Sequence, residues 1–275
     1  MSGRNRASGW KHAKLSGHSN EQLLDKRLNR DEDYQRDLLR RIGRDGRFLH
    51  ASVGGPREKN VECIFPGETT KSKTDMYILL DDGSRCNISI KKSLGGQVYL
   101  IRDQRFILGF ERQYGKPIPE SVQRAIQVFW GSAEDTPDLI KAYGTSEVYE
   151  RRKNRLVADS LKVYDANLYY ELLQWFVDNA YEITDFCFSK GLAKNREDWA
   201  DILWYKNELG ENSVDEIIPI GELCNRVQRA AQAHTSYGTR GGGTTIQLPF
   251  GFVQWHQAQM QFHHRYDRIH QIMAE

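Results

Sequence analysis

The chain has 275 residues, 39% of them hydrophobic, which is enough to bury a core and to form one large domain. Lys and Arg number 39 against 37 Asp and Glu, so a uniformly basic surface is excluded and nucleic-acid contact requires basic residues gathered on one face. The four cysteines are widely spaced and show no CxxC or Cys/His pattern, which excludes a disulfide framework and a structural zinc site and predicts reduced thiols in a cytoplasmic protein. No apolar run approaches the about 18 residues of a membrane-spanning helix, and the first residues lack the apolar centre of a signal peptide.

The amino-terminal part predicts a basic arm followed by a helix. Residues 1–18 are basic and contain Gly and Ser, and we expect them to be irregular. Ser19 or Asn20 offers an N-cap for a helix that continues to about Arg41. Within that helix Glu21 shares the inward-facing stripe with Leu24 and Leu28, so a carboxylate is expected on the packed side.

Residues 74–92 predict a β-hairpin. An apolar run follows Asp75 and ends at Leu80, Asp82-Gly83 supplies the turn, and residues 85–91 return in strict alternation. Paired strands are the expected structure of such a pattern.

The hairpin directs an acid and an amine toward one place. Side chains alternate with period two, so Asn87, Ser89 and Lys91 share one face of the return strand. Asp75 begins the neighbouring strand, opposite the end of the return strand. An aspartate and a lysine in these positions can share a metal ion and a phosphate group.

The remaining elements alternate between helix and strand. A short strand over 61–65 precedes the hairpin, and a helix over 97–114 follows it. Further along the chain we predict helices over 121–130, 167–188, 221–233 and 256–273, and strands over 200–205, 216–220 and 244–255, the last interrupted at Pro249. The pattern indicates an α/β fold around a modest sheet.

This combination resembles the PD-(D/E)XK nuclease superfamily, and in particular the type II restriction endonucleases. In that family a first helix carries a glutamate, a hairpin carries an aspartate and then an acid-x-lysine triplet, and a helix follows. The matching positions here are Glu21, Asp75 and the triplet Ser89-Ile90-Lys91, and the likeness spans about residues 16–114. The resemblance implies a restriction-endonuclease-like core, with a mixed central sheet flanked by helices and additional C-terminal helices. We expect a single domain over 19–275, with catalytic elements within about 19–114 and recognition elements within 115–275.

The resemblance also implies a site-specific endonuclease that hydrolyses double-stranded DNA with Mg²⁺ and leaves a 5′-phosphate. The acids, Asp75 and Glu21 among them, would hold Mg²⁺ at the scissile phosphate, and Lys91 would serve the attacking water and the developing charge. A homodimer is expected, because a palindromic site is read by two-fold symmetry. The alternatives are a structure-specific repair or junction nuclease, and a DNA-binding protein of the same fold that has lost catalysis.

Two positions depart from the family pattern. Thr74 replaces a proline that carries no chemistry, whereas Ser89 replaces the acid of the triplet and is a poor Mg²⁺ ligand. Some restriction enzymes with this replacement recruit a glutamate from the following helix, so Glu111 is a candidate substitute. Asn87, on the same strand face, and Glu62, on the preceding strand, are the alternatives.

Candidate DNA contacts lie in the basic arm, in a glycine-rich loop over 237–245 and in the predicted helix over 256–273. Lysine binds DNA phosphates. Arginine and hydroxyl side chains bind the DNA backbone or guanine, and glutamine pairs bidentately with adenine. The residues selected on these grounds are Lys11, Lys14, Gln97, Arg240, Thr244, Gln254 and Gln257.

Overall fold

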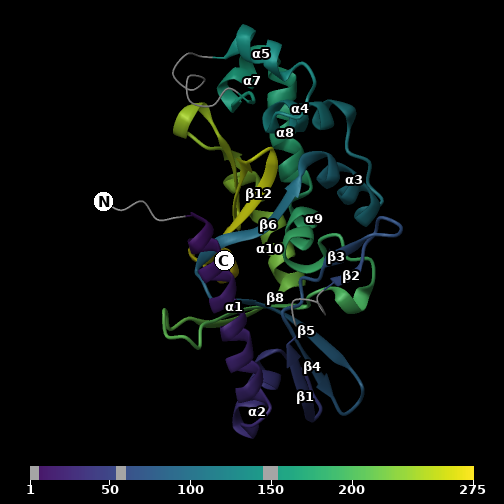
Figure 1. Ribbon diagram of the computed structural model, residues 1–275, viewed down its shortest axis with the longest axis vertical. Helices are drawn as coiled ribbons and strands as arrows, with labels where there is room; N and C mark the ends of the chain where they lie inside the picture. Colours follow the sequence, from purple (N-terminus) through teal and green to yellow (C-terminus); the bar gives the residue numbers. More distant parts are fainter. Residues whose placement is uncertain (1–5, 54–59, 145–153) are drawn as a thin grey trace. The chain divides into compact units, whose positions relative to one another are not determined.

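The computed structural model describes residues 6–53, 60–144 and 154–275, with side chains described from residue 17 onward. Contacts between Cα atoms divide the chain into two compact units, Met1–Leu94 with Phe188–Glu222, and Gly95–Cys187 with Leu223–Glu275. Each unit contains its own five-stranded sheet, and some of the strands are labelled in Figure 1. The single domain expected over 19–275 stays a prediction.

The sheet of the first unit is mixed. Its strand order is β1-β4-β5-β7-β8, in which β5 and β7 run parallel and all other neighbours run antiparallel. This arrangement confirms the mixed α/β class expected from the sequence. The strands are β1 (Phe48–Val53), β4 (Met76–Leu80), β5 (Arg85–Lys91), β7 (Ile202–Lys206) and β8 (Asp215–Pro219), beside a separate antiparallel pair of β2 (Asn60–Glu62) and β3 (Thr69–Lys71).

Strands β4 and β5 form the predicted hairpin. Gly83 has a φ of +80°, which an L side chain rarely adopts, and the Asp82 carboxylate accepts a hydrogen bond from the backbone N–H of Ser84 at 2.8 Å. The register pairs Met76 with Ile88, so the beginning of β4 lies beside the end of β5. The site residues are therefore brought together by local chain geometry.

Two helices cover one face of this sheet. Leu24 and Leu28 of α1 (Arg6–Leu28) are fully buried and belong to one apolar cluster with Met76, Ile88 and Trp204. These strand residues share one face, so α1 packs opposite the face that carries Ser89 and Lys91. The burial of Leu24 and Leu28 confirms the inward stripe expected in this helix.

The ends of these helices differ from expectation. Helix α1 begins at Arg6, within the stretch expected to be irregular, and ends at Leu28. A second helix, α2 (Glu32–Arg41), starts after Asp31, whose carboxylate accepts a hydrogen bond from the N–H of Tyr34 at 3.0 Å. Between the two helices, the Asn29 side chain donates back to Asp25 of α1 and also binds the backbone of Ala51 in β1 through both its amide nitrogen and its oxygen.

The sheet of the second unit is antiparallel throughout, in the order β6-β12-β11-β10-β9. Two sequence predictions are wrong here. Gln97 lies in a strand, because the helix expected over 97–114 begins at Asp103, and residues 259–265 form a strand instead of part of a helix over 256–273. The strands are β6 (Gly95–Arg102), β9 (Ser236–Tyr237), β10 (Thr245–Leu248), β11 (Gly251–His256) and β12 (Gln259–Arg265).

An aromatic core joins this second sheet to its helices. Phe106 of α3 (Asp103–Tyr114) lies 5.7 Å from Phe262 of β12 and 6.1 Å from Trp175 of α8, measured between ring centroids. The other helices in this part of the chain are α4 (Glu120–Trp130), α5 (Thr136–Tyr143), α7 (Ala158–Tyr164), α8 (Ala166–Asp178), α9 (Ala180–Asp185), α10 (Ile220–His234) and α11 (Tyr266–Ala274). Short turns of other helix types are η1 (Phe186–Lys190), η2 (Arg196–Asp198) and η3 (Arg240–Gly242).

All four cysteines are buried, and no disulfide joins them in the described structure. Burial raises the pKa of the Cys86 thiol to about 12, which keeps it protonated. None of the described helices is both long enough and apolar enough to cross a bilayer.

Candidate active site

Asp75, Ser89 and Lys91 meet at one end of the β4–β5 hairpin. The Lys91 ammonium nitrogen lies 3.7 Å from Oδ2 of Asp75, and the side chains of Lys91 and Asp75 are 18% and 21% exposed. Ser89 is 2% exposed and lies between them. The predicted convergence of an acid and an amine is thus present in the folded chain.

The backbone of β5 holds the aspartate. The N–H of Asp75 donates to the carbonyl of Ile88 at 2.9 Å, and the N–H of Ile90 donates to Oδ2 of Asp75 at the same distance. A carboxylate fixed by strand hydrogen bonds loses little further freedom when it binds a ligand. Asp75 is therefore oriented before any substrate arrives.

Ser89 connects the two charged groups. Its hydroxyl accepts a hydrogen bond from Nζ of Lys91 at 2.7 Å and donates to Oδ2 of Asp75 at 3.2 Å. Lys91 also reaches the carbonyl of Ile90 at 3.3 Å. The residue at the position of the missing acid thus aligns the lysine without adding a negative charge.

Asn87 lies on the same face but is committed to structural hydrogen bonds. Its amide nitrogen donates to the carbonyls of Glu197 and Trp199, both at 2.8 Å, and its amide oxygen accepts from Nε of Arg85 at 2.6 Å. Asn87 therefore ties β5 to the segment before β7 in this conformation. Its role as a metal ligand stays a prediction.

Glu21 lies at the same end of the sheet as Lys91. The neighbouring Asn20 binds the carbonyl of Lys206 and the N–H of Glu208, just after β7, and β7 runs beside β5 with Tyr205 opposite Lys91. Glu21 itself is 13% exposed and forms an ion pair with His18 at 3.5 Å. Helix α1, which carries Glu21, covers the face of the sheet opposite to the one that carries Lys91.

The candidate replacements for the missing acid have structural partners of their own. Glu111 belongs to the second unit, where its carboxylate accepts hydrogen bonds from the N–H of Ile118 at 2.9 Å and from Nε2 of Gln123 at 3.3 Å. Glu62 is exposed and pairs with Lys194, whose hydrogen bond lowers the pKa of Glu62. Which residue supplies a second acid stays a prediction.

The donor set at Asp75 fits one particular mode of Mg²⁺ binding. Among the described residues there is no group of three or more His, Cys, Asp or Glu side chains placed to hold a metal ion. Mg²⁺ is, however, commonly held by one or two carboxylates together with water and substrate phosphates, and not by a cage of protein ligands. Asp75 suits that mode, which requires the phosphate to be present.

The residues selected for DNA contact fall into three structural settings. Gln97 and Gln254 lie on one face of the second sheet, and Gln257 is exposed in the turn between β11 and β12. Arg240 is exposed in η3, and Thr244 follows it. Lys11 and Lys14 lie in α1, but their side chains are outside the described residues.

The glycine-rich loop is anchored to the second unit. Gly243 has a φ of +81°, and a Cβ at this position would lie 2.5 Å from the Cβ of Ala158. The carbonyl of Gly243 also accepts a hydrogen bond from the N–H of Ala158 at 3.0 Å. The glycine-rich loop is thus held against α7, while the Arg240 side chain stays exposed.

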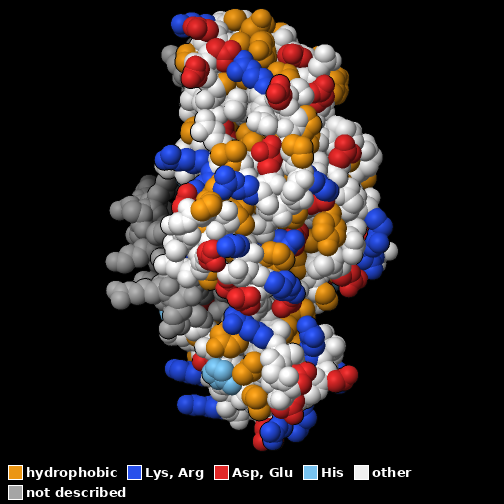
Figure 2. All heavy atoms as spheres, turned by 90° about the vertical axis from the view of Figure 1, so that its right-hand side faces the viewer, with side chains coloured by type: hydrophobic (Ala, Val, Ile, Leu, Met, Phe, Trp, Pro, Cys, Tyr) orange, Lys and Arg blue, Asp and Glu red, His pale blue; other side chains and the backbone are white. Residues whose placement is uncertain are grey.

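The charges on one face of the molecule are mixed. Figure 2 shows Lys and Arg side chains interspersed with Asp and Glu over that face, and neither sign forms a continuous patch there. The basic surface that nucleic-acid binding requires is not on the face drawn.

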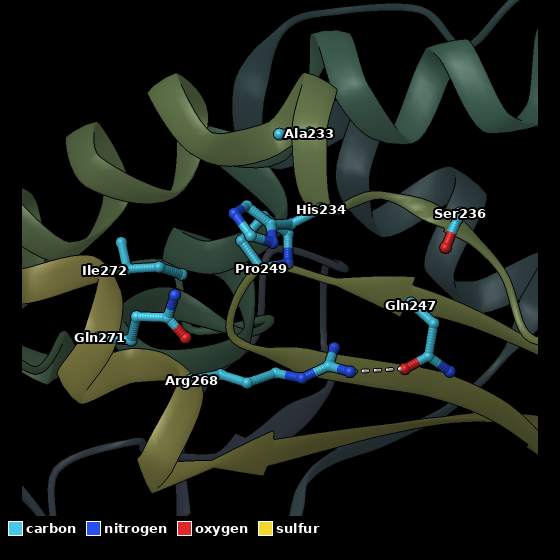
Figure 3. Close-up of a pocket in the computed structure, with 8 residues that line it drawn as sticks. All are labelled: Ala233, His234, Ser236, Gln247, Pro249, Arg268, Gln271 and Ile272. Carbon is cyan, nitrogen blue, oxygen red and sulfur yellow. Dashed lines mark hydrogen bonds between the residues drawn. The ribbon is translucent and has the colours of Figure 1, made fainter. Parts of the chain in front are cut away.

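A polar cavity of about 250 Å³ in the second unit was not foreseen. Arg268 of α11 crosses it and donates to the side-chain oxygen of Gln247 at 3.0 Å and to the carbonyls of Leu248 and Gly251 (Figure 3). Burial lowers the pKa of this guanidinium. No sequence signal marks the site, since it depends on carbonyls at the adjoining ends of β10 and β11.

Comparison with known proteins gives a structural likeness but no likeness in sequence. No model of a known protein family and no curated protein sequence matches the chain. The structure is similar to a crystal structure of the restriction endonuclease MspI in complex with its cognate DNA, over 92% of this chain and 87% of that chain, with 12% sequence identity and a TM-score of 0.48. At so low an identity and score, the likeness assigns neither a family nor a function to this chain.

Proposed function

We propose that this protein is a site-specific, Mg²⁺-dependent endonuclease for double-stranded DNA, of the type II restriction kind. The proposal is carried by one observation, the half-buried contact of 3.7 Å between the Asp75 carboxylate and the Lys91 ammonium at the end of the hairpin. Paired opposite charges held by backbone hydrogen bonds beside a serine hydroxyl suit the binding of a metal-phosphate unit.

In the proposed reaction, water attacks the phosphorus atom, the bond to the 3′-oxygen breaks, and the products carry a 5′-phosphate and a 3′-hydroxyl. When bound, Mg²⁺ would polarise the phosphate and neutralise its charge. Asp75 would supply the first carboxylate, and the Lys91 ammonium would stabilise the charge that develops on the phosphate oxygens. Ser89 would hold the ammonium in position through the bond of 2.7 Å.

The remaining parts of the proposal concern further ligands and assembly. Glu21 is proposed as an accessory acid because α1 is anchored beside the end of β7, next to Lys91. Glu111 is proposed as the substitute for the acid that Ser89 lacks. A homodimer is proposed because two-fold symmetry matches a palindromic DNA site.

A second candidate function is a DNA-binding protein without catalysis. It is favoured by the neutral Ser89 at the position of an acid, and by the lack of a three-ligand group among the described residues. In this alternative the contact between Asp75 and Lys91 only fastens the strand ends.

Incubation of the purified chain with phage DNA and with a branched DNA junction in Mg²⁺, with an EDTA control in which DNA binding is measured, tests the proposal. Discrete fragments with 5′-phosphate ends, formed only with Mg²⁺, are the expected result. A smear indicates a nuclease without sequence specificity, and cutting restricted to branched DNA indicates a junction enzyme. No cutting of any substrate, together with DNA binding, favours the alternative without catalysis.

A further inference from the structure

Strands β11 and β12 form a two-stranded ribbon with an unusual turn. The register pairs Gln254 with Gln261 and His256 with Gln259, which leaves Gln257 and Ala258 as the turn. Both turn residues are exposed and have positive φ angles, +51° and +57°. They are the only non-glycine residues with positive φ in the described part of the chain.

The sequence of this turn is not the one that turn stability favours. A two-residue turn with positive φ at both positions is formed most readily by Asn-Gly, because an L side chain with a Cβ is strained in that conformation. Gln257-Ala258 accepts this strain at the tip of the ribbon. Strained residues concentrate where a side chain has a task other than stabilising the fold.

A ladder of amides crosses the sheet behind the turn. Nε2 of Gln254 donates to Oε1 of Gln261 at 2.8 Å, and Nε2 of Gln261 donates to Oε1 of Gln97 at 2.7 Å. Among the described residues, no hydrogen-bond partner occupies Nε2 of Gln97 or Oε1 of Gln254. The ladder therefore fixes the orientation of its amides and leaves one donor and one acceptor for a ligand.

The strands contribute no acidic side chain to the face that carries the ladder. Their described positions on this face, given by the strand register, are Ser236, Thr245, Gln247, Phe252, Gln254, His256, Gln259, Gln261, His263, Arg265, Gln97, Leu100 and Arg102. Arg265, at the end of β12, is paired with Asp267 of α11. The opposite face carries buried residues such as Val253 and Phe262. A surface of neutral and basic side chains can approach the phosphates of DNA without charge repulsion.

We propose that the β11–β12 ribbon enters the major groove of duplex DNA and reads an adenine, through Gln257 at its tip and the amide ladder behind it. The groove is about 12 Å wide and admits a two-stranded ribbon, and glutamine pairs bidentately with N6 and N7 of adenine. The inference rests on the proposed function for its substrate class, duplex DNA. It assigns sequence recognition to an element that is separate from the hairpin holding Asp75 and Lys91.

The test is selection from a pool of random duplexes by the full chain in EDTA, so that cleavage plays no part. The main variant combines Gln257→Gly with Ala258→Gly, which relieves the turn and removes the side-chain amide that would pair with adenine. Ala258→Gly alone is the control for strain, and Gln174→Ala on α8 is the control for loss of an exposed glutamine. Gln97→Glu keeps the oxygen that accepts from Gln261 but replaces the unoccupied amide nitrogen by a carboxylate oxygen.

We expect the wild type and both controls to enrich one motif that contains an adenine. The double variant should melt at a higher temperature than the wild type, yet bind that motif about tenfold more weakly, and Gln97→Glu should lose the preference at one base pair. Replacing the adenine of the motif by 7-deazaadenine, which lacks N7, should weaken binding of the duplex by the wild type by a similar factor.

Two results overturn the inference. One is the same motif, bound with the same affinity, by the double variant; the other is the absence of any enriched motif for the wild type. Both are distinct from failure of the proposed function. If the protein never cuts DNA with Mg²⁺ but selects a motif through this ribbon, the inference stands and the proposed function is wrong. If the double variant cuts DNA at the same sites as the wild type, the proposed function stands and the inference is wrong.

Discussion

The ammonium of Lys91 lies 3.7 Å from the carboxylate of Asp75, with the hydroxyl of Ser89 hydrogen-bonded to both. Ser89 and Lys91 belong to β5, and Asp75 directly precedes the antiparallel β4. Backbone groups of β5 form hydrogen bonds with both the N–H and the carboxylate of Asp75. This arrangement makes separate predictions for the lysine, the serine and the distant acids.

Lys91→Met should lower the rate of DNA cleavage by about 100-fold or more, because a preorganised donor to the developing phosphate charge is lost. Lys92→Met is the matched control, since Nζ of Lys92 pairs with Glu211 at 3.1 Å. Single-turnover cleavage of a plasmid measures both. An equal fall in cleavage rate in the two variants would show that Lys91 has no special role in catalysis.

Ser89→Asp should restore the acid that the site lacks. In EDTA the variant should melt at a lower temperature than the wild type, because two carboxylates then share a half-buried site. Mg²⁺ should raise its melting temperature, and half-maximal cleavage should need about tenfold less Mg²⁺, since a second charged ligand tightens binding. Ser93→Asp, at an exposed position shortly after the strand, is the control. An unchanged Mg²⁺ requirement in Ser89→Asp would show that no metal binds beside Asp75.

Glu111→Gln separates a metal ligand from a structural side chain. The amide retains an oxygen that can accept from the N–H of Ile118, now at 2.9 Å, so the melting temperature should change little. Glu111→Ala removes that acceptor and should destabilise the fold by about 1 kcal/mol. We expect both variants to cleave at least about tenfold more slowly at limiting Mg²⁺, because a charged ligand is lost. Cleavage at the wild-type rate by Glu111→Gln would transfer the role of substitute acid to Asn87 or Glu62.

Asp215 should make stability depend on pH in acid. Burial opposes ionisation, but hydrogen bonds from Arg41, Lys206 and Trp204 outweigh it and lower the pKa of Asp215 from 3.8 to about 2. A carboxyl with a lowered folded-state pKa contributes stability that is fully present above pH 3.8 and is lost as the pH falls through about 2.

Asp215→Asn tests this contribution by urea unfolding at several pH values. The variant should be less stable than the wild type by about 1 kcal/mol near neutral pH, a figure that allows for solvent screening of a partly exposed group. The difference should shrink below pH 3.8 and approach its minimum near pH 2. A difference that stays constant over this range would contradict the assigned pKa.

The hairpin was predictable because its information is local. Alternation along 85–91 and the turn at Asp82-Gly83 fix the register, and the register alone brings Asp75 beside Ser89 and Lys91. The hydrogen bonds of the Asn87 amide were not predictable, since the carbonyls that accept them belong to Glu197 and Trp199, 110 and 112 residues away in the chain. The alternation along a strand predicts which side chains share a face. It does not predict which distant backbone groups those side chains bind.

The second sheet was missed for a related reason. The segment QMQFHHR, residues 259–265, alternates polar and apolar residues as a strand does, yet its glutamines and aromatic residues also satisfy a helical stripe. The choice is decided by pairing of β12 with β6, which joins Gln259 to Arg102 across the chain. Long-range pairing of this kind overrides a local period.

Cleavage by Asp75→Asn tests the central claim most directly. The change is nearly isosteric, and the remaining oxygen can still accept from the N–H of Ile90, now at 2.9 Å from Oδ2. With enzyme in excess over DNA and with Mg²⁺ present, we expect no cutting under conditions where the wild type cuts to completion, while DNA affinity measured in EDTA stays within about twofold. Cutting by Asp75→Asn at a rate close to that of the wild type would contradict the assignment of this site.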